Sequence, residues 1–372
     1  MEKKKREIIY DIFSFLPLEI IYDIFSRLPV KSLTCLKCVS KFYRSLVSDP
    51  SFLDIHHTHS ISRPDKTKFL ACSLGGNFSY TVDEKVQHTK ASVLHIEELD
   101  GINYNRFDYV NGLFCLWSVE LHPPVIYNLT TRKVRFLPRL NSDGNEFTHY
   151  YYSLGFEPGE KKYKILMITH PEKTPTRCWI FTLGSSESWR EIESALSLVL
   201  PISISGGVCI NGVIYFFGKY NNKVYIVEFN VRTEKFRIIS LWKDEKYIPP
   251  VKFYNLIELE GKLAAIDHSR RSRTEMDLWI LERSERSEEW VKYIIAFPYM
   301  FLSTWLMSFV CCSYTPDGEI VLTTNSSYTR NWIFFFDLKK KSWRGIEIPD
   351  REKIDIIGVY SHVDSLVSCI YC

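Results

Sequence analysis

The sequence has no long apolar run and almost no net charge. No uninterrupted stretch approaches the roughly 20 apolar residues that a membrane-spanning helix needs. The 47 Lys and Arg nearly cancel the 44 Asp and Glu, which disfavours a nucleic-acid binder that works through bulk positive charge. The apolar segment after Lys3–Arg6 is interrupted by Asp11 and Pro17 and has no small-residue cleavage site, which argues against a signal peptide. We expect neither membrane nor nucleic acid as a partner, and a location in the cytoplasm, the nucleus or both.

Motifs of common catalytic sites are missing as well. There is no G-x-S-x-G nucleophile elbow, no Walker phosphate loop and no H-E-x-x-H metal motif. Two C-x-x-C pairs, Cys35 with Cys38 and Cys369 with Cys372, lie at opposite ends of the sequence, whereas the halves of a zinc module are usually roughly 12–20 residues apart. We therefore expect no catalytic residue, no cofactor and no metal, and we expect Cys35 and Cys38 to be small buried apolar residues.

The first part of the chain has helical spacing. With 45% apolar and 15% aromatic residues, the 372-residue chain can bury a large core. Pro17 suits a first helical turn, apolar residues then recur at intervals of three and four as far as Leu28, and Pro29 ends the helix. A second apolar series follows, at Leu33, Leu36, Val39, Phe42 and Leu46. Three short helices of roughly 40 residues bury their own apolar faces poorly, so this unit needs a partner.

Segment 16–52 also carries an ordered set of residues: LPLEI at 16–20, Ile24, LPVKSL at 28–33, KCVSKFYRSL at 37–46 and DPSF at 49–52. This set resembles the F-box, in the form found in the plant F-box-associated family. F-boxes of that family dock on a Skp-type adaptor and through it on a cullin. The resemblance implies an all-α, three-helix unit whose adaptor-facing residues are Leu16, Pro17, Ile20, Ile24, Leu28, Pro29 and Leu33. The alternative is that some of these residues only hold the three helices together.

Three details qualify this resemblance. Ser40 and Tyr43 stand where the family usually has Cys and Trp, which we expect to loosen the third helix. Residues 7–18 and 19–30 are near-copies, identical at ten of twelve positions, and only the second copy continues into the rest of the motif. We therefore treat 1–15 as an N-terminal extension that duplicates the first helix and 16–60 as the F-box. We interpret the histidines at 56, 57 and 59 as part of a polar linker.

From residue 68 the pattern changes to short strands rich in Val, Ile, Phe, Tyr and Trp. A glycine turn recurs at intervals of 47, 53, 49 and 57 residues, at Asn111-Gly112, Pro158-Gly159, Asn211-Gly212, Glu260-Gly261 and Asp317-Gly318. An aromatic-rich second hairpin follows each turn, as in Val125–Leu129 with Val134–Phe136. Two hairpins in each period of about 50 residues are typical of propeller blades.

The sequence predicts that 61–372 is an all-β propeller of about six four-stranded blades. Five blades are complete in the sequence. The sixth combines a first hairpin near Asp364-Ser365 with a second hairpin from Lys68–Cys72 and Phe78–Val82. Strands from both ends of the domain thus close the ring. Segments such as Gly155–Glu157, Ile210–Tyr215 and Gly261–Ala264 also resemble the F-box-associated region of the family, which is kelch-like in architecture only.

The resemblance implies a two-part adaptor of a ubiquitin ligase, in which the F-box docks and the propeller holds an unidentified target protein. Polar loops such as Ser118–His122 and Asn325–Arg330 suit recognition. One loop is a candidate to face the target and attract an acidic or phosphorylated surface, and it contains His268, Arg270, Arg271 and Arg273. The alternative is that this loop is only solvated. We expect the mixed-charge stretch Glu282–Glu289 to be a solvated turn. Two alternatives are a propeller scaffold that no longer docks and a propeller enzyme.

Overall fold

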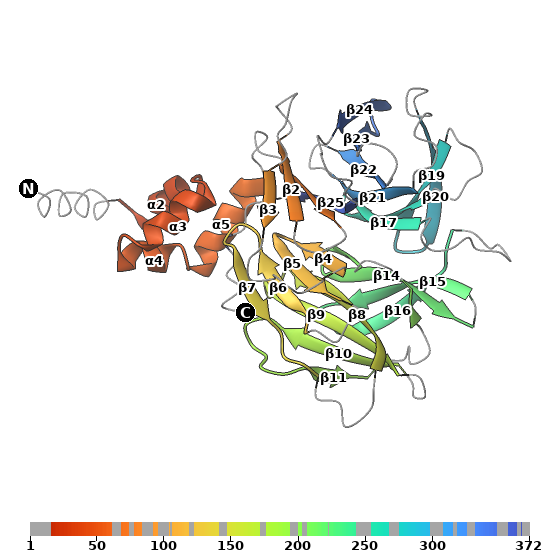
Figure 1. The fold of residues 1–372 in the computed structure, drawn as a ribbon, viewed down its shortest axis with the longest axis horizontal. Coiled ribbons are helices and arrows are strands. Elements are labelled where there is room, and N and C mark those ends of the chain that lie inside the picture. Colours follow the sequence, from red (N-terminus) through yellow and green to blue (C-terminus); the bar gives the residue numbers. More distant parts are fainter. Residues whose placement is uncertain are drawn as a thin grey trace, which may run out of the picture.

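The computed structural model describes residues 16–61, 366 and most of the chain from 68 to 362 (Figure 1). The gaps within 68–362 are 74–77, 84–91, 96–103, 105, 119–122, 141–146, 172–175, 194–199, 203–206, 222, 243–253, 268–274, 298–307, 315–317, 326–331 and 348–355. The N-terminal extension that duplicates the first helix lies outside the described residues.

Four helices are described, where the sequence predicted three: α2 (Leu18–Ser26), α3 (Val30–Lys37), α4 (Lys41–Leu46) and α5 (Pro50–Ile61). Prolines fix the first two boundaries, because Pro17 and Pro29 are the N-caps of α2 and α3. The fixed φ of proline suits a helix start, and its missing N–H would have no intrahelical partner there.

Helix α5 occupies the segment that we interpreted as a polar linker, and that interpretation is wrong. The carboxylate of Asp49 accepts hydrogen bonds from the N–H groups of Ser51 (2.9 Å) and Phe52 (3.2 Å) and so caps the first turn. The buried His56 ring lies 3.1 Å from the carbonyl of Leu28, and the Ser26 hydroxyl lies 2.9 Å from Nδ1 of His59. The histidines therefore join α5 to the end of α2.

Both departures from the family pattern make contacts in the third helix, and the expectation that they loosen it relative to Cys and Trp stays a prediction. The hydroxyl of Ser40 accepts a hydrogen bond from the backbone N–H of Tyr43 at 3.3 Å and so provides the N-cap of α4. The ring of Tyr43 is buried against Phe25, with 5.4 Å between the ring centroids.

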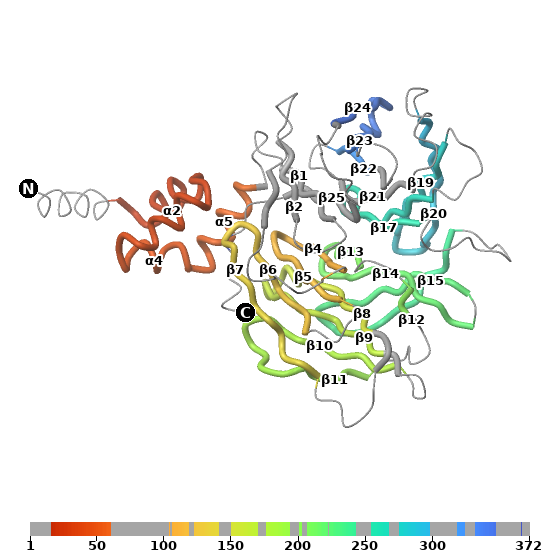
Figure 2. Tube along the Cα trace, in the orientation of Figure 1, coloured from red at the N-terminus to blue at the C-terminus, as the bar shows by residue number. Residues whose placement is uncertain are grey.

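The strands form six antiparallel sheets arranged as a ring, and the sheets follow one another in sequence order (Figures 1 and 2). The first complete sheet contains β4 (Arg106–Val110), β5 (Leu113–Trp117), β6 (Val125–Asn128) and β7 (Lys133–Phe136). The next contains β8 (Phe147–Glu157), β9 (Lys162–Pro171), β10 (Arg177–Thr182) and β11 (Arg190–Ile192). A later sheet contains β17 (Tyr254–Leu259), β18 (Lys262–Asp267), β19 (Glu275–Arg283) and β20 (Glu288–Ala296). The sheet after it contains β21 (Ser308–Tyr314), β22 (Glu319–Asn325), β23 (Trp332–Asp337) and β24 (Ser342–Glu347).

One sheet has five strands, so the expectation of six four-stranded blades holds for five of them. Its members are β12 (Leu200–Pro201), β13 (Val208–Ile210), β14 (Val213–Tyr220), β15 (Lys223–Asn230) and β16 (Lys235–Ile239). Because β15 pairs along one edge of β14, both β12 and β13 pair along the other edge, at opposite ends of it. The extra strand therefore results from an inner strand that is made in two pieces.

Strands from both ends of the domain form the remaining sheet, but not in the predicted proportion. The order is β25 (Ile356–His362), β1 (Lys68–Ser73), β2 (Phe78–Asp83) and β3 (Ser92–His95). The C-terminal part contributes one strand and the N-terminal part three, whereas we expected a hairpin from each. Strands β25 and β1 pair antiparallel, with Tyr360 opposite Leu70. This pairing covers an edge that would otherwise be open.

The glycine turns adopt the backbone that a two-residue hairpin requires. Asn111 and Gly112 have φ of 48° and 88°, and Asn211 and Gly212 have 48° and 80°. Both central residues thus have positive φ, as in a type I′ turn. The turn at Pro158-Gly159 is different: β8 ends at Glu157 and β9 begins at Lys162, and the residue with positive φ (57°) is Lys161.

The hydrophobic core lies between neighbouring sheets. Buried Trp117 of one sheet belongs to the same apolar cluster as Phe181 of the next, Ile180 shares a cluster with Phe216, and Leu278 shares one with Phe334. The alternating apolar residues of the strands are therefore buried by the adjacent blade, which explains why one repeat cannot be stable alone.

A buried polar network ties the inner strands of three sheets together. One Asp108 oxygen accepts from the hydroxyl of Ser153 (2.7 Å) and the N–H of Leu154 (2.9 Å), and the other accepts from the N–H of Tyr109 (2.8 Å). The N–H of Gly207, just before β13, donates to Ser153 Oγ at 3.0 Å. Burial raises the pKa of the Asp108 carboxyl to about 7, although these hydrogen bonds oppose the shift.

The helices and the ring contact each other. Leu366, which follows β25 in the sequence, is 4% exposed and is part of the helical core together with Leu33 and Phe52. Lys161, in the β8–β9 turn, forms an ion pair with Asp54 of α5. The helical unit stands at one side of the ring, with α5 nearest to it (Figure 1).

Candidate functional site

Helix α2 has both buried and exposed apolar side chains among the residues that the structure describes. Ile21 and Phe25 are buried in the helical core. Leu18, Ile20 and Ile24 are 50%, 45% and 43% exposed. At about 100° per residue, Ile20 and Ile24 share one exposed face of the helix, whereas Leu18 lies on another side, at the first turn. Large apolar side chains that are exposed together, as Ile20 and Ile24 are, are typical of a surface that binds a partner.

A shallow groove of about 460 Å³ lies at α3. It is lined by Leu28, Lys31, Ser32, Cys35, Leu36 and Val39. Val39, just beyond α3, is 68% exposed, and Phe42 of α4 is 41% exposed. Exposed apolar side chains therefore occur on α2, at the groove and on α4. We call the exposed side chains of Ile20, Ile24, Val39 and Phe42, together with the groove, the docking face.

The residues predicted to face an adaptor occupy three kinds of position. Pro17, Ile20 and Ile24 are exposed, whereas Leu16, Leu28 and Pro29 are half-buried. Leu33 is fully buried in the helical core, so it belongs to the residues that hold the helices together and is not part of an exposed face in this structure. Sequence reasoning missed the exposure of Leu18, Val39 and Phe42, because helical spacing alone does not reveal which apolar side another helix covers.

The charge around the groove is basic. Between Leu28 and Ser48 the sequence contains Lys31, Lys37, Lys41 and Arg44 and no acidic residue. Burial and the charge of Lys133 lower the pKa of Lys37. The nearby Asp23 carboxylate is bound by Arg27 at 2.7 Å, and the hydrogen bond from Arg27 lowers the pKa of Asp23. The groove thus combines apolar side chains with the positive charge of Lys31, which suits an apolar partner surface that carries acidic groups.

The predicted target-facing loop cannot be placed, since His268, Arg270, Arg271 and Arg273 lie outside the described residues. The same holds for most of the loops Ser118–His122 and Asn325–Arg330. These residues stay a prediction for the propeller.

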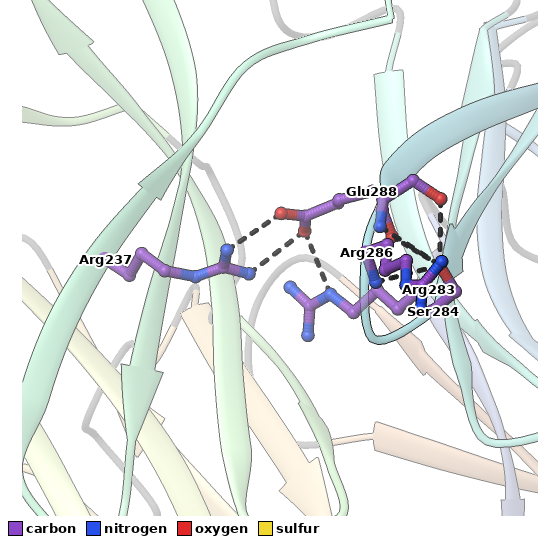
Figure 3. A pocket seen from close by; sticks show the side chains of 6 residues that line it. Arg237, Arg283, Ser284, Arg286 and Glu288 are labelled. Atoms are coloured by element: carbon purple, nitrogen blue, oxygen red, sulfur yellow. Dashed lines mark hydrogen bonds and ion pairs between the residues drawn. The ribbon is translucent and has the colours of Figure 1, made fainter.

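A second pocket, of about 350 Å³, lies where the outer strands of two blades meet, and it is lined by Arg237, Arg283, Ser284, Arg286, Ser287 and Glu288 (Figure 3). Both carboxylate oxygens of Glu288 bind Arg237, at 2.8 and 3.0 Å, and Arg283 also binds Glu288, at 2.9 Å. Glu228 binds both guanidinium groups as well. Because the two carboxylates already neutralise the two guanidiniums, this network works as a clamp between blades rather than as an anion site.

Neither a metal site nor a membrane span was found in the part of the chain that the structure describes. There, no three side chains of His, Cys, Asp or Glu gather as metal ligands do. In the same residues no helix is long and apolar enough to cross a membrane.

Comparison with protein families matches both parts of the chain. A model of the F-box domain matches residues 13–55, and a model of the F-box associated β-propeller domain matches residues 59–367. The docking face therefore lies within the F-box match, and the six sheets lie within the propeller match.

Similar proteins come from Arabidopsis thaliana. F-box protein At3g57590 is 30% identical over 367 residues, which are 94% of this chain and 85% of that protein. F-box protein At5g65850 is 28% identical, over 94% of this chain and 88% of its own length, and F-box protein At1g47340 is 28% identical, over 91% and 76%.

Proposed function

Because the chain belongs to the plant F-box proteins that carry an F-box associated β-propeller domain, we propose that it is a substrate-recognition subunit of a Skp–cullin–F-box ubiquitin ligase. In this proposal the docking face binds a Skp-type adaptor, and the propeller holds a target protein in the cytoplasm or the nucleus. The chain itself is non-catalytic.

One observation above all supports docking: Ile20 and Ile24 are close to half exposed on a helix that packs into the helical core through Ile21 and Phe25. Completing the burial of such side chains contributes roughly 1–1.5 kcal/mol each at the usual 25 cal/mol per Å². The lysines beside the groove add electrostatic attraction to an acidic partner, which raises the association rate more than the affinity.

The proposed mechanism is proximity. A target held on the ring and a ubiquitin-conjugating enzyme held through the adaptor become parts of one complex, so their encounter no longer depends on diffusion. The contacts of Leu366 and Asp54 between helices and ring favour a fixed distance between the two binding surfaces. A fixed distance limits which target lysines can reach the enzyme.

The test is a binding measurement between the full chain and a recombinant plant Skp-type adaptor. The double variant Ile20→Asp with Ile24→Asp places two charges on the docking face, and we expect it to weaken binding roughly hundredfold. Ile294→Asp is the matched control, because Ile294 is 57% exposed on β20 of the propeller and lies outside the docking face. This control should bind like the unchanged protein.

Two results would contradict the proposal. The first is that the unchanged protein does not bind the adaptor, which would favour a scaffold that works outside a ligase. The second is that the double variant and the Ile294→Asp control bind equally well. Thermal melting of all three proteins should agree within a few degrees, since every substituted side chain is exposed and exposed substitutions change stability little, about 0.5 kcal/mol.

A further inference from the structure

Two cysteines lie at the end of α3, beside the groove. Cys35 lines the groove, Cys38 is the C-cap of α3, and both are exposed, whereas we had expected them to be buried. Cys115 and Cys178, in contrast, are buried in the propeller. The exposed pair is thus open to reagents in solution that cannot reach those two thiols.

The backbone at this point places the two cysteines three residues apart in one tight turn. The N–H of Cys38 donates to the carbonyl of Cys35 at 3.1 Å, and the N–H of Val39 donates to the carbonyl of Leu36 at 3.0 Å. Bonds between residues three apart mark a 3₁₀ turn, in which the side chains at i and i+3 are eclipsed. In a regular α-helix the Cβ atoms of such a pair are about 5–6 Å apart, and a disulfide needs about 3.5–4.5 Å, so the tighter turn supplies part of the approach.

The present hydrogen bond of Cys38 is easy to give up. Its thiol lies 3.9 Å from the carbonyl of Thr34, one turn back along the helix. A thiol is a weak donor, and rotation about one side-chain bond turns it toward Cys35.

We propose that Cys35 and Cys38 form a redox-active dithiol that a peroxide converts into a disulfide within the helix. One thiolate attacks the peroxide, an S–O bond forms as the O–O bond breaks, and hydroxide leaves and takes up a proton to become water. The second thiol then attacks the sulfenic sulfur, so that the S–S bond forms, the S–O bond breaks and a second water leaves. Two thiols and one hydrogen peroxide thus yield one disulfide and two water molecules.

Oxidation changes the docking face, a consequence that rests on the proposed function. Cys35 lines the same groove as Leu36 and Val39, and Val39 directly follows Cys38. A disulfide fixes the last turn of α3 and displaces these side chains from their reduced positions. We expect the oxidised protein to bind a Skp-type adaptor about fivefold or more weakly, as when one well-packed interface side chain is lost.

The sequence offers a direct assay of the disulfide, because Lys37 lies between the two cysteines. Trypsin cleaves after Lys31, Lys37 and Lys41 and releases residues 32–37 and 38–41 as separate peptides from the reduced protein. After treatment of the full chain with hydrogen peroxide and blocking of free thiols, the two peptides should appear as one linked species that lacks two hydrogen atoms. The Cys38→Ser variant should give no linked species, and Cys209→Ser should give it in full yield.

Different outcomes would overturn the formation of the disulfide and its effect on adaptor binding. If peptides 32–37 and 38–41 remain unlinked while residue 35 or 38 is oxidised to the sulfinic level, the dithiol is refuted. If the link forms but reduced and oxidised protein bind the adaptor equally, control of docking is refuted. If reduced protein does not bind at all, the proposed function fails, whereas the peptide assay still decides whether the disulfide forms.

Discussion

Replacing Asp108 by asparagine should change how the stability of the propeller depends on pH. Asp108 is 4% exposed, and burial raises its pKa from 3.8 to about 7. Below pH 4 the carboxyl is protonated in both the folded and the unfolded chain. As the pH rises, the unfolded chain releases this proton while the folded chain keeps it, so the stabilisation is lost progressively until the pH passes about 7.

The size of the effect follows from the shift. Each pKa unit corresponds to 1.36 kcal/mol, so between pH 5 and pH 8 the unfolding free energy should lose about 3 kcal/mol through Asp108 alone. Asparagine cannot titrate and removes this loss. Its amide nitrogen cannot accept from the N–H of Leu154, which adds a constant cost of about 1–3 kcal/mol at every pH.

The assay is thermal or urea unfolding of both proteins at pH 5, 6, 7 and 8. The advantage of the unchanged protein over Asp108→Asn should shrink as the pH rises, by roughly 6 °C in melting temperature over this range at about 2 °C per kcal/mol. Ser153→Ala is the control: it removes a hydrogen bond that lowers the pKa of Asp108, so the pH dependence should persist. A difference between Asp108→Asn and the unchanged protein that is constant across this range would refute the reasoning.

Two further predictions concern the helical unit. Leu366→Ala should destabilise the helices by about 2–5 kcal/mol, because it opens a cavity in the helical core, to which Leu366 belongs. Amide hydrogen exchange in residues 18–61 should therefore become faster. Unchanged exchange there would show that the contact is not part of the core. Ser40→Ala should remove the N-cap of α4 and cost about 1 kcal/mol in urea unfolding, whereas Ser40→Asp should restore it; equal stability of the two variants would contradict the cap.

Local features of the fold could be predicted from the sequence because neighbouring residues determine them. Pro17 marks the start of α2, and Pro29, predicted to end the first helix, separates α2 from α3 and is the N-cap of α3, because proline fixes its own φ wherever the rest of the chain lies. Asn211-Gly212 adopts a two-residue hairpin because both residues tolerate positive φ. The repeat of such turns with aromatic hairpins was sufficient to predict a ring of sheets, since one period contains one blade.

Features that depend on distant residues were decided only by the tertiary structure. Helical spacing gave Leu33 and Ile24 the same apolar character, but Leu33 is fully buried in the helical core while Ile24 is 43% exposed. The histidines of α5 looked like a linker until Ser26 and Leu28 supplied their hydrogen-bond partners. Likewise, the sequence could not show that the C-terminal part contributes a single strand to the closing sheet, with Tyr360 opposite Leu70 of β1. Spacing along the chain determines which side of a helix or strand is apolar, but whether that side is covered depends on which distant residues fold against it.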